Sequence, residues 1–500
     1  MKKLSVVLTL VIAVMAMAVA PVFGQDRDYD AIDPAELEGQ VVTFWHQHSG
    51  FREVQLNVLI AVFNDPDITG EELIAASGYA GTDADERERL QAIADAVRDY
   101  AREYNPFGII VNPSNQGGYG DIFSKMTTEL AAGGSELPSL VVAYQNQSAT
   151  YQVVDGLIDM TPLVESPIWG LAEEDIADFF PGFWAQDIFP TFDNMRLAFP
   201  PNRSMEVMYY NIDWLAELAE AGAISFDGPP TTPEQFAEAA CAAVENPFSG
   251  ATGAESPLGY QLSMDASRFA SWTFAFGGDI FDYDAVQYSL DSDAAVEAIS
   301  FLRDLFDQGC AGEVFERFGD QANFGAGTTL FTVGSSSGLP FYGNAVDAGA
   351  GHAWSVAAIP HVTEQPVQNV YGASVSIPVT DPVQELATWL FLKFYTDPFV
   401  NAVWAESSNY FPVRISSAES MDSYFEANPA YATAFELLPF VRAEPPVPGY
   451  DPVRNEMASV MQAATTSSDP RPVAEILADL NEVANEQLEI SSAGLDLIID

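Results

Sequence analysis

Few residues in this sequence have the types and spacing of a catalytic or metal-binding site. The 500-residue chain contains four histidines, and two of them form the run His46-Gln47-His48. Zinc sites in proteins use at least three protein ligands, and no third candidate follows this pair closely in the sequence. We therefore interpret the pair as part of a polar turn, and we predict neither a metal site nor a cofactor.

Carboxylates are the most abundant chemically active side chains. At this abundance, neighbours such as Glu173 and Glu174 occur through composition alone, so a pair does not identify the two carboxylates of a glycosidase. No acidic segment has the Asp-x-Asp-x-Asp-Gly spacing of a calcium loop. We predict that the protein is not an enzyme, and a secreted carboxylate-dependent glycosidase stays as an alternative.

The overall charge excludes whole classes of partner. Asp and Glu number 72 against 19 Lys and Arg, which gives a formal net charge of -53. Nucleic acids are bound through clustered Lys and Arg, so nucleic acid is excluded as a partner, and anionic membrane surfaces are disfavoured for the same reason. Because 48% of the residues are hydrophobic and only 18% are charged, the chain should nevertheless fold into two or three domains or two large lobes.

The N-terminal segment has the composition of an export signal. Residues 1–24 begin with two lysines, continue as an apolar run and end with small residues at Gly24, which is the order of a secretory signal peptide. An N-terminal membrane anchor is the alternative. We expect an exported protein that is periplasmic or extracellular and associated with the cell envelope. In that oxidising environment Cys241 and Cys310 either form a disulfide or stay as two buried thiols, and the sequence leaves both open.

Hydrophobic periodicity predicts a mixed chain in which strands and helices alternate. The first part has expected strands at 41–45, 108–111 and 139–143, and expected helices at 53–63, 85–104 and 121–132. Later come expected helices at 212–221, 233–244, 294–308, 383–404 and 472–488, and expected strands at 330–333, 355–359 and 370–377. This alternation predicts an α/β lobe with a mainly parallel sheet. No extended low-complexity linker separates the parts, so we expect lobes that the chain crosses more than once.

Several short motifs occur in an order that is typical of one family. They are VTFWH at 42–46, NQGGY at 115–119, LPSLVVAY at 137–144, PNRSMEVMYYN at 201–211, GGDIFD at 277–282, GSSSG at 334–338, YGAS at 371–374 and YFPVR at 410–414. This order resembles extracellular solute-binding protein family 1, the sugar-binding proteins of bacterial ABC importers, and it is nearest to the glycerol-3-phosphate-binding branch. The resemblance covers nearly the whole chain after residue 24. The segment from about residue 65 to 99 has no counterpart in it.

The resemblance implies a fold and a division of the chain. The expected fold is α/β and two-lobed, of the periplasmic-binding-protein type II, with a ligand cleft between lobes joined by a hinge that the chain crosses several times. We expect the first lobe to contain residues 40–162 and about 369–418. The second lobe should contain about 163–368 and 419–495.

The resemblance also implies a function. The protein would be the substrate-binding subunit of an ABC importer, a monomer that captures a sugar or polyol by lobe closure and delivers it to a transmembrane permease. A glycerol-3-phosphate or glycerophosphodiester ligand is the alternative within the family. So acidic a protein repels an anion at long range, so we rank the neutral sugar or polyol first. A surface adhesion protein without any small-molecule cleft is a third hypothesis.

The matching segments, together with the aromatic residues near them, give a candidate ligand site. Its expected members are Trp45, His46, Tyr119, Tyr144, Gln145, Ser204, Trp272, Ser336, Gly372 and Arg414. Aromatic rings would cover the C–H faces of a sugar, and amide, hydroxyl and backbone N–H groups would bond its hydroxyls. Arg414 could form a forked bond to a phosphate or carboxylate. Gln145 departs from the glycerol-3-phosphate branch, which has an acidic residue at this place.

Overall fold

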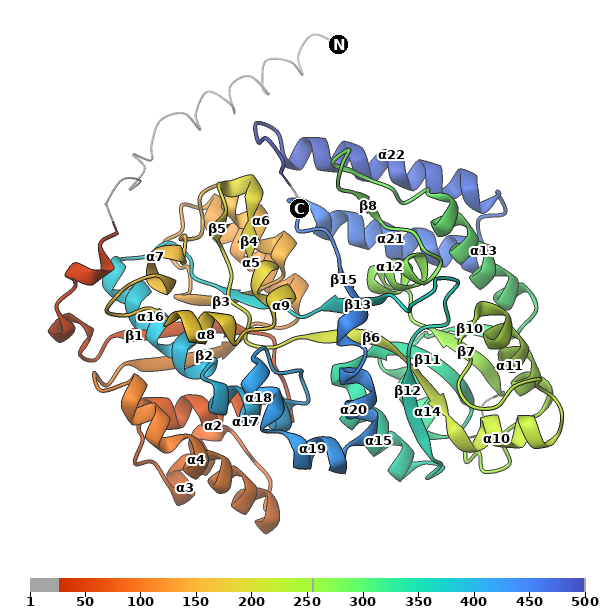
Figure 1. Ribbon diagram of the computed structural model, residues 1–500, viewed down its shortest axis with the longest axis horizontal. Coiled ribbons are helices and arrows are strands. Elements are labelled where there is room, and N and C mark those ends of the chain that lie inside the picture. Colours follow the sequence, from red (N-terminus) through yellow and green to blue (C-terminus); the bar gives the residue numbers. More distant parts are fainter. Residues whose placement is uncertain (1–26, 254–255, 499–500) are drawn as a thin grey trace, which may run out of the picture.

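The computed structural model describes residues 27–253 and 256–498, so the expected signal peptide lies outside the described residues. The chain forms two lobes, each built around its own β-sheet with helices packed against it (Figure 1). The two-lobed α/β fold predicted from the sequence is confirmed.

The sheet of the first lobe has four strands. Its order is β14 (Ser374–Ser376), β3 (Leu140–Ala143), β1 (Val41–His46) and β2 (Ile110–Asn115). Strand β1 runs parallel to β2 and β3, and only β14 is antiparallel to its neighbour. Helices α2 (Phe51–Asn64), α5 (Tyr119–Ala131) and α16 (Pro382–Tyr395) contact β2, β3 and β1 respectively. All four residues of β3 are buried, as expected for a parallel sheet that is covered on both faces.

The sheet of the second lobe is longer. Its order is β10 (Ala311–Glu313), β7 (Leu258–Leu262), β11 (Thr329–Ser335), β6 (Ser204–Asn211), β13 (Gln368–Tyr371) and β15 (Val441–Ala443), and β12 (Trp354–Ala357) also pairs with β6. Strands β10, β7 and β11 are mutually parallel, whereas β6 is antiparallel to β11, β12 and β13. Helices α10 (Ile212–Glu220), α11 (Pro233–Glu245), α12 (Ala266–Ala275), α13 (Asp293–Asp307), α21 (Tyr450–Thr465) and α22 (Val473–Ser491) contribute to the core of this lobe.

Two elements expected to be continuous are each divided in the structure. The strand expected at 370–377 is split into β13 and β14, which belong to different sheets, and Gly372 lies between them with a φ of 147°. The helix expected at 383–404 is split into α16 and α17 (Pro398–Ser408). Proline has no N–H to donate and disfavours a helical residue before it, so the first helix ends and Asp397 caps the second.

The chain crosses between the lobes three times in the described residues. It crosses just before β6, again at Gly372, and again between α18 (Ile415–Glu419) and α20 (Pro429–Phe435), which packs on β12. The multi-crossing hinge implied by the resemblance is therefore present.

The first crossing differs from the expected boundary near residue 163. Trp169, Phe179 and Phe199 belong to the apolar core of the first lobe, and the Phe199 ring lies 5.2 Å from that of Trp389 on α16. Phe199 also exchanges backbone hydrogen bonds with Val375 of β14. Residues 163–199 therefore pack with the first lobe, because their aromatic side chains complete its core.

The segment without a counterpart in the resemblance is helical. It contains α3 (Gly70–Ser77) and most of α4 (Ala84–Tyr104), and both helices pack against α2 on the outside of the first lobe. Helix α4 buries Leu90, Ala94 and Val97, which are spaced as one face of a helix, while most of its other residues are charged or polar.

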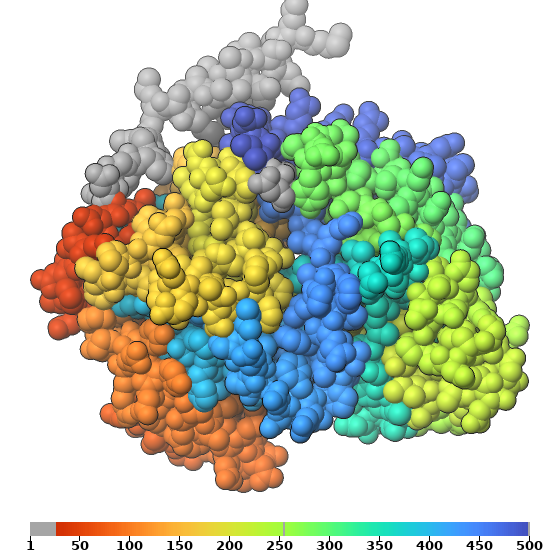
Figure 2. All heavy atoms as spheres, viewed as in Figure 1, coloured from red at the N-terminus to blue at the C-terminus, as the bar shows by residue number. Residues whose placement is uncertain are grey.

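Two further features hold the molecule together. Cys241 of α11 and Cys310 form a disulfide with a Cα–Cα distance of 4.6 Å, which decides between the bridge and the two free thiols. The lobes also contact each other directly, since the Gln147 amide of α6 (Gln145–Gln152) donates to the Asp451 carboxylate of α21 over 3.0 Å. Figure 2 shows the two lobes packed together, with segments of the C-terminal part of the chain (blue) between them. The lobes are therefore in direct contact beside the hinge crossings.

Candidate ligand cleft

The parallel strands of both sheets end at one cleft between the lobes. On the first lobe, His48 follows β1, Tyr119 follows β2 and Tyr144 follows β3. On the second lobe, Ser263 follows β7 and Ser335 is the last residue of β11. Glu313 is the last residue of β10, and residues 314–318 follow that strand. Ligands in α/β proteins bind beyond the carboxyl ends of parallel strands, so this convergence makes the cleft the candidate binding site.

The cleft consists of two hollows that share part of their lining. One has a volume of about 750 Å³ and the other about 640 Å³, and both are lined by Tyr119, Tyr144, Asp265 and Tyr371. A larger hollow of about 1380 Å³ lies elsewhere between the lobes and is lined mainly by helices and the loops that join them. Because the strand ends converge on the two smaller hollows, we assign the ligand to these.

Tyrosines form one wall of the cleft. The rings of Tyr119 and Tyr144 are tilted against each other with their centroids 4.6 Å apart, and the Gln47 amide donates to the Tyr119 hydroxyl over 2.9 Å. Burial raises the pKa of Tyr119 well above its usual value, and burial likewise raises the pKa of Tyr144. Both hydroxyls therefore stay protonated at neutral pH, and the rings offer apolar faces together with hydroxyl groups that can bond a polar ligand.

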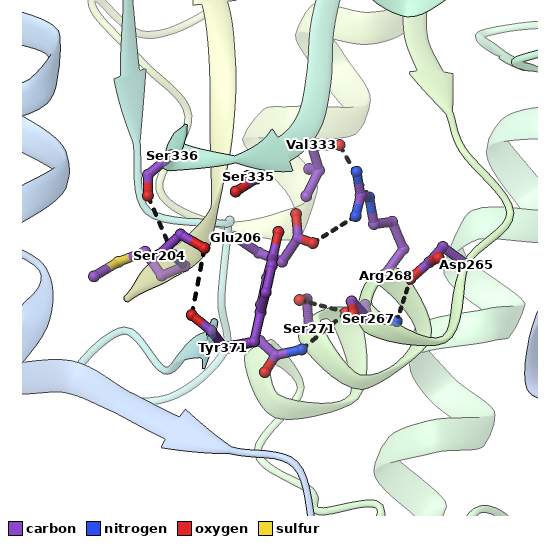
Figure 3. Close-up of polar contacts among 12 residues, drawn as sticks. Ser204, Glu206, Asp265, Ser267, Arg268, Ser271, Val333, Ser335, Ser336 and Tyr371 are labelled. Carbon is purple, nitrogen blue, oxygen red and sulfur yellow. Dashed lines mark hydrogen bonds and ion pairs between the residues drawn. The ribbon is translucent and has the colours of Figure 1, made fainter. Parts of the chain in front are cut away.

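Three arginines of the cleft are already engaged by other groups of the protein. Arg268 of α12 pairs with Glu206 of β6 and donates to the Val333 carbonyl over 3.1 Å, as Figure 3 shows. Arg52 of α2 donates to the Ser408 and Ser337 carbonyls.

Arg454 of α21 lies on the second hollow and pairs with Glu444, and its guanidinium is 3.5 Å from the Asp265 carboxylate. Because each of these three guanidiniums is bonded within the protein, their donors are largely used before a ligand arrives.

Half of the residues predicted for the site line the cleft. These are Tyr119, Tyr144, Gln145, Ser204 and Gly372. The Gln145 amide also donates to Asp187 over 2.9 Å, and the Ser204 hydroxyl donates to the Tyr371 carbonyl over 3.3 Å (Figure 3). The structure therefore brings these residues together, and their contact with ligand stays a prediction.

Three residues predicted for the cleft pack within or against the lobe cores instead, and Trp45 among them is half-buried. Trp45 lies against the apolar cluster that covers one face of β3, because successive side chains of a strand point to opposite faces. His46 is buried beside Phe44, with their rings 5.6 Å apart. Trp272 is fully buried in the second lobe, where its ring nitrogen donates to the Tyr260 hydroxyl over 3.1 Å.

The other two predicted residues, Ser336 and Arg414, are bonded to backbone groups away from the cleft surface. The Ser336 hydroxyl accepts from the Met205 N–H over 3.1 Å (Figure 3). Arg414 donates to the Thr396 and Asp175 carbonyls over 2.6 and 2.8 Å, and it stacks on Phe179. Arg414 therefore stabilises the first lobe and is not placed to bind a phosphate, because its donors satisfy buried carbonyls.

Ser336 is also the central residue of the run Gly334-Ser335-Ser336-Ser337-Gly338, which has the G-x-S-x-G spacing of a serine-hydrolase elbow between a strand and a helix. Its hydroxyl is buried and bonded to backbone, and no histidine is bonded to it among residues 27–253 and 256–498. The run therefore lacks the base that would activate a nucleophile.

Sequence reasoning missed much of the lining on the second lobe. The missed residues include Asp265 and Arg268 at the start of α12, residues 313–318, Phe341, Tyr371 and Arg454. Apart from Tyr371, which begins the YGAS motif, these residues lie outside the motifs, and strands β7 and β10 were not predicted. Had those two strands been found, the rule that ligands bind at strand ends would have indicated Asp265 and residues 313–318.

Two properties of the described part of the chain concern other kinds of site. Within residues 27–253 and 256–498, no three His, Cys, Asp or Glu side chains are grouped so that they could hold a metal ion. In the same ranges, no helix is long and apolar enough to span a membrane.

Comparisons with known proteins agree with this architecture. A curated relative, the sn-glycerol-3-phosphate-binding periplasmic protein of Brucella abortus, is 24% identical over 327 residues, covering 62% of this chain and 69% of its own length. Among solved structures, the cyclic alpha-maltosyl-1,6-maltose binding protein of Arthrobacter globiformis superposes with a TM-score of 0.66 at 16% identity, covering 90% of this chain and all of its own.

UgpB of Mycobacterium tuberculosis, solved in complex with glycerophosphocholine, gives a TM-score of 0.64 at 20% identity, covering 80% of this chain and 96% of its own. The family model described as bacterial extracellular solute-binding protein matches residues 95–433, which is more than half of the chain. The two-lobed fold and this match lead to one conclusion: the chain belongs to the bacterial extracellular solute-binding protein family.

Proposed function

We propose that this solute-binding protein captures a neutral sugar or polyol in the cleft between its lobes and delivers it to the permease of an ABC importer. The observation that supports a neutral ligand is that three of the four cleft arginines, Arg52, Arg268 and Arg454, are engaged by carbonyls and carboxylates of the protein itself. The fourth, Arg317, is exposed and lies over the Phe318 ring. A phosphate would need guanidinium donors that are free to form charge-assisted bonds. Sugar hydroxyls need only neutral donors and acceptors, which the tyrosines and serines of the cleft provide.

The charge of the cleft lining supports the same choice. The larger of the two hollows is lined by four carboxylates, those of Asp265, Glu313, Glu316 and Asp320, and by three arginines. Burial also lowers the pKa of His48, which lines this hollow, well below its usual value, so this histidine is neutral at pH 7. The lining therefore provides no excess of positive charge to hold a dianion, in a protein whose net charge is already -53.

The working cycle follows from the two lobes. A ligand that contacts both lobes favours the closed form by its differential affinity for that form. The protein acts by binding and release and catalyses no reaction, and it works outside the cytoplasm. The names of its relatives keep glycerol-3-phosphate and glycerophosphocholine as the second candidate ligand class.

A thermal-shift and calorimetric screen distinguishes the two ligand classes. Ligand at about 100 times its Kd should stabilise the folded protein by about 2.7 kcal/mol. The panel should contain mono-, di- and trisaccharides, pentitols, glycerol-3-phosphate and glycerophosphocholine. We expect a rise in Tm and a binding heat with a sugar or polyol and none with the two phosphates. Binding of the phosphates alone would overturn the proposal.

A further inference from the structure

A buried carboxylate lies directly behind the lining of the cleft. Glu206 of β6 is fully buried, and one of its oxygens accepts a hydrogen bond from the Nη1 nitrogen of Arg268 (Figure 3). Its other oxygen has no hydrogen-bond partner within residues 27–253 and 256–498. A buried ion pair is seldom more stable than apolar packing, and an unused buried oxygen costs further stability. Fold stability therefore does not account for this side chain.

Arg268 connects this carboxylate to the cleft. Its side chain is 15% exposed and lines the 750 Å³ hollow. The Nε nitrogen donates to the Val333 carbonyl and Nη1 donates to Glu206, but Nη2 makes no hydrogen bond in the part of the chain that the structure describes. A side-chain carbon added at Gly334, which lines the same hollow, would lie 3.7 Å from Nη2. Glycine at this position therefore leaves space beside Nη2 for a ligand.

The pairing of Arg268 differs from that of Arg454 in its exposure to solvent. The carboxylates beside Arg454, those of Glu444 and Asp265, belong to side chains that are 10% and 48% exposed. The Glu206 side chain has no exposed surface, and buried charges are screened by salt much less than exposed ones. The charge of Glu206 therefore acts on Arg268 with little screening.

The state of this pair determines which kind of ligand oxygen suits Nη2. With the carboxylate in place the pair is neutral, and Nη2 offers N–H donors to a hydroxyl. Without the carboxylate, the same donors would belong to a guanidinium free of its bonded counter-charge, which suits a phosphate. A ligand oxygen on Nη2 would lie across one guanidinium from Glu206, roughly 6 Å away by ordinary hydrogen-bond lengths. At that separation one unit of charge changes the affinity for an anion by about tenfold or more.

We propose that Glu206 makes the cleft select neutral ligands over phosphates, by cancelling the charge of Arg268 while its Nη2 donates to a ligand hydroxyl. Glu206 acts through Arg268 and does not touch the ligand, so it is a positioning residue. This inference rests on the proposed function and names the residue that decides between its two candidate ligand classes.

Glu206→Gln tests the inference, because it removes the charge and keeps the shape of the side chain. The anionic probe is sn-glycerol-3-phosphate, and the neutral probe is the sugar or polyol of the screening panel that binds the natural protein most tightly. In calorimetry at pH 8, the affinity for sn-glycerol-3-phosphate relative to the neutral probe should be at least tenfold higher in the variant than in the natural protein. Glu206→Asp, which keeps the charge, should stay within threefold of the natural ratio.

Two controls show whether the effect passes through Arg268. The double variant Glu206→Gln and Arg268→Gln should lose the gain in phosphate affinity, because the guanidinium is gone. Glu313→Gln removes a carboxylate that lines the same hollow but bonds the Gln462 amide, and it should change the ratio less than threefold. An equal gain in Glu313→Gln, or a gain that survives in the double variant, would overturn the proposal.

A pH titration of the natural protein provides the test if Glu206→Gln does not fold. Burial raises the pKa of Glu206 to about 7, against the opposing effect of Arg268, whose guanidinium stays charged. The pair therefore gains positive charge between pH 8.5 and pH 6, and binding of inorganic sulfate should tighten at least fivefold. Arg268→Gln should abolish this tightening. The titratable groups that face Glu206 from neighbouring elements are Arg268, Asp265, Tyr209, Tyr371 and Glu444.

Failure of this inference and failure of the proposed function can be told apart. The role of Glu206 is overturned if Glu206→Gln folds without gaining phosphate affinity, or if acidification does not tighten sulfate binding to the natural protein. In either case binding of a sugar or polyol by the natural protein would leave the proposed function standing. If the natural protein at pH 8 bound sn-glycerol-3-phosphate and no neutral member of the panel, the proposed function would fail, and the inference with it.

Discussion

Tyr119 is the residue on which the proposed site depends most directly. It lines both hollows of the cleft, packs against Tyr144 and accepts a hydrogen bond from Gln47. Its ring and hydroxyl are therefore placed to make both kinds of contact that a sugar requires.

Tyr119→Ala should weaken sugar binding about tenfold, because the loss of one aromatic contact and its hydrogen bond costs roughly 1.4 kcal/mol or more. Calorimetric titration with the tightest-binding sugar of the panel measures this change. Tyr100→Ala is the matched control, since Tyr100 stacks on Phe399 on the first lobe and lines neither hollow of the cleft. Equal affinities for the two variants would contradict the site.

The buried His46 makes a prediction about acid stability. Burial lowers its pKa to about 4, from an ordinary value of 6.5. Between these two values the unfolded chain binds a proton that the folded protein does not, so this contribution to stability is complete above pH 6.5 and is lost as the pH falls toward 4.

His46→Gln removes that dependence. The free energy of unfolding of the natural protein should fall by about 3 kcal/mol more than that of the variant between pH 7 and pH 4. Urea unfolding at a series of pH values measures the difference, and the other titrating groups cancel because both proteins share them. If the free energy of unfolding fell equally in both proteins between pH 7 and pH 4, His46 would be protonated in the folded state.

At the scale of elements, the junction between β13 and β14 carries one of the crossings between lobes. A side-chain carbon added at Gly372 would lie 2.9 Å from the Cα atom of Arg203, next to the first crossing, and its φ of 147° disfavours any other residue. The same region holds a fully buried ion pair between Arg203 and Asp187, 3.2 Å apart. Two crossings are thus packed closely against each other.

Gly372→Ala should therefore lower the free energy of unfolding by about 1–3 kcal/mol, because neither the backbone conformation nor the contact with Arg203 can be kept without strain. Chemical denaturation measures the loss. Gly182→Ala, on a short helix where an added methyl group meets no atom within 4 Å, should cost much less. A cost as small for Gly372 as for Gly182 would mean that the junction is not tightly packed.

At the scale of the whole molecule, a contact between α6 and α21 joins the two lobes beside the second hollow. The Asp451 carboxylate accepts hydrogen bonds from the side-chain amides of Asn146 and Gln147. The Gly449 N–H, just before α21, donates to the Thr150 hydroxyl over 3.1 Å. These bonds join the two lobes, so we expect them to break if the lobes move apart.

Asp451→Ala should shift the lobes toward the open form, since hydrogen bonds to a charged group contribute about 1.5–3 kcal/mol each. We expect roughly tenfold weaker sugar binding or more, together with a larger radius of gyration by small-angle X-ray scattering. Glu456→Ala, an exposed carboxylate on the same helix, is the control. If Asp451→Ala left both the affinity and the radius unchanged, the contact would not stabilise closure.

The sequence predicted helices and strands correctly where their formation depends on residues close by in the chain. The strand at 41–45, the helix at 233–244 and the helix at 294–308 lie within two residues of β1, α11 and α13. Periodicity and helix caps decide such elements locally: Thr232 and Ser292 each accept a backbone N–H at the start of the helix that follows. The family could also be identified, because the order of several motifs is independent of any one contact.

The tertiary structure decided what depends on distant residues. The run at 370–377 fits a single strand, and its local pattern does not show that β13 joins one sheet and β14 the other. In the same way, Tyr119 and Trp272 are both aromatic residues in helices, yet the first lines the cleft and the second is buried among Phe236 and Tyr260.

Composition and local pattern thus determined the acidic surface, the elements and the family of this protein. Pairing between segments far apart in the chain decided which strand ends meet across the cleft. It also decided which arginines of the cleft already have partners. The physical reason is that hydrophobic burial and strand pairing are satisfied by the whole fold, so the direction of a side chain is not fixed until its distant neighbours are in place.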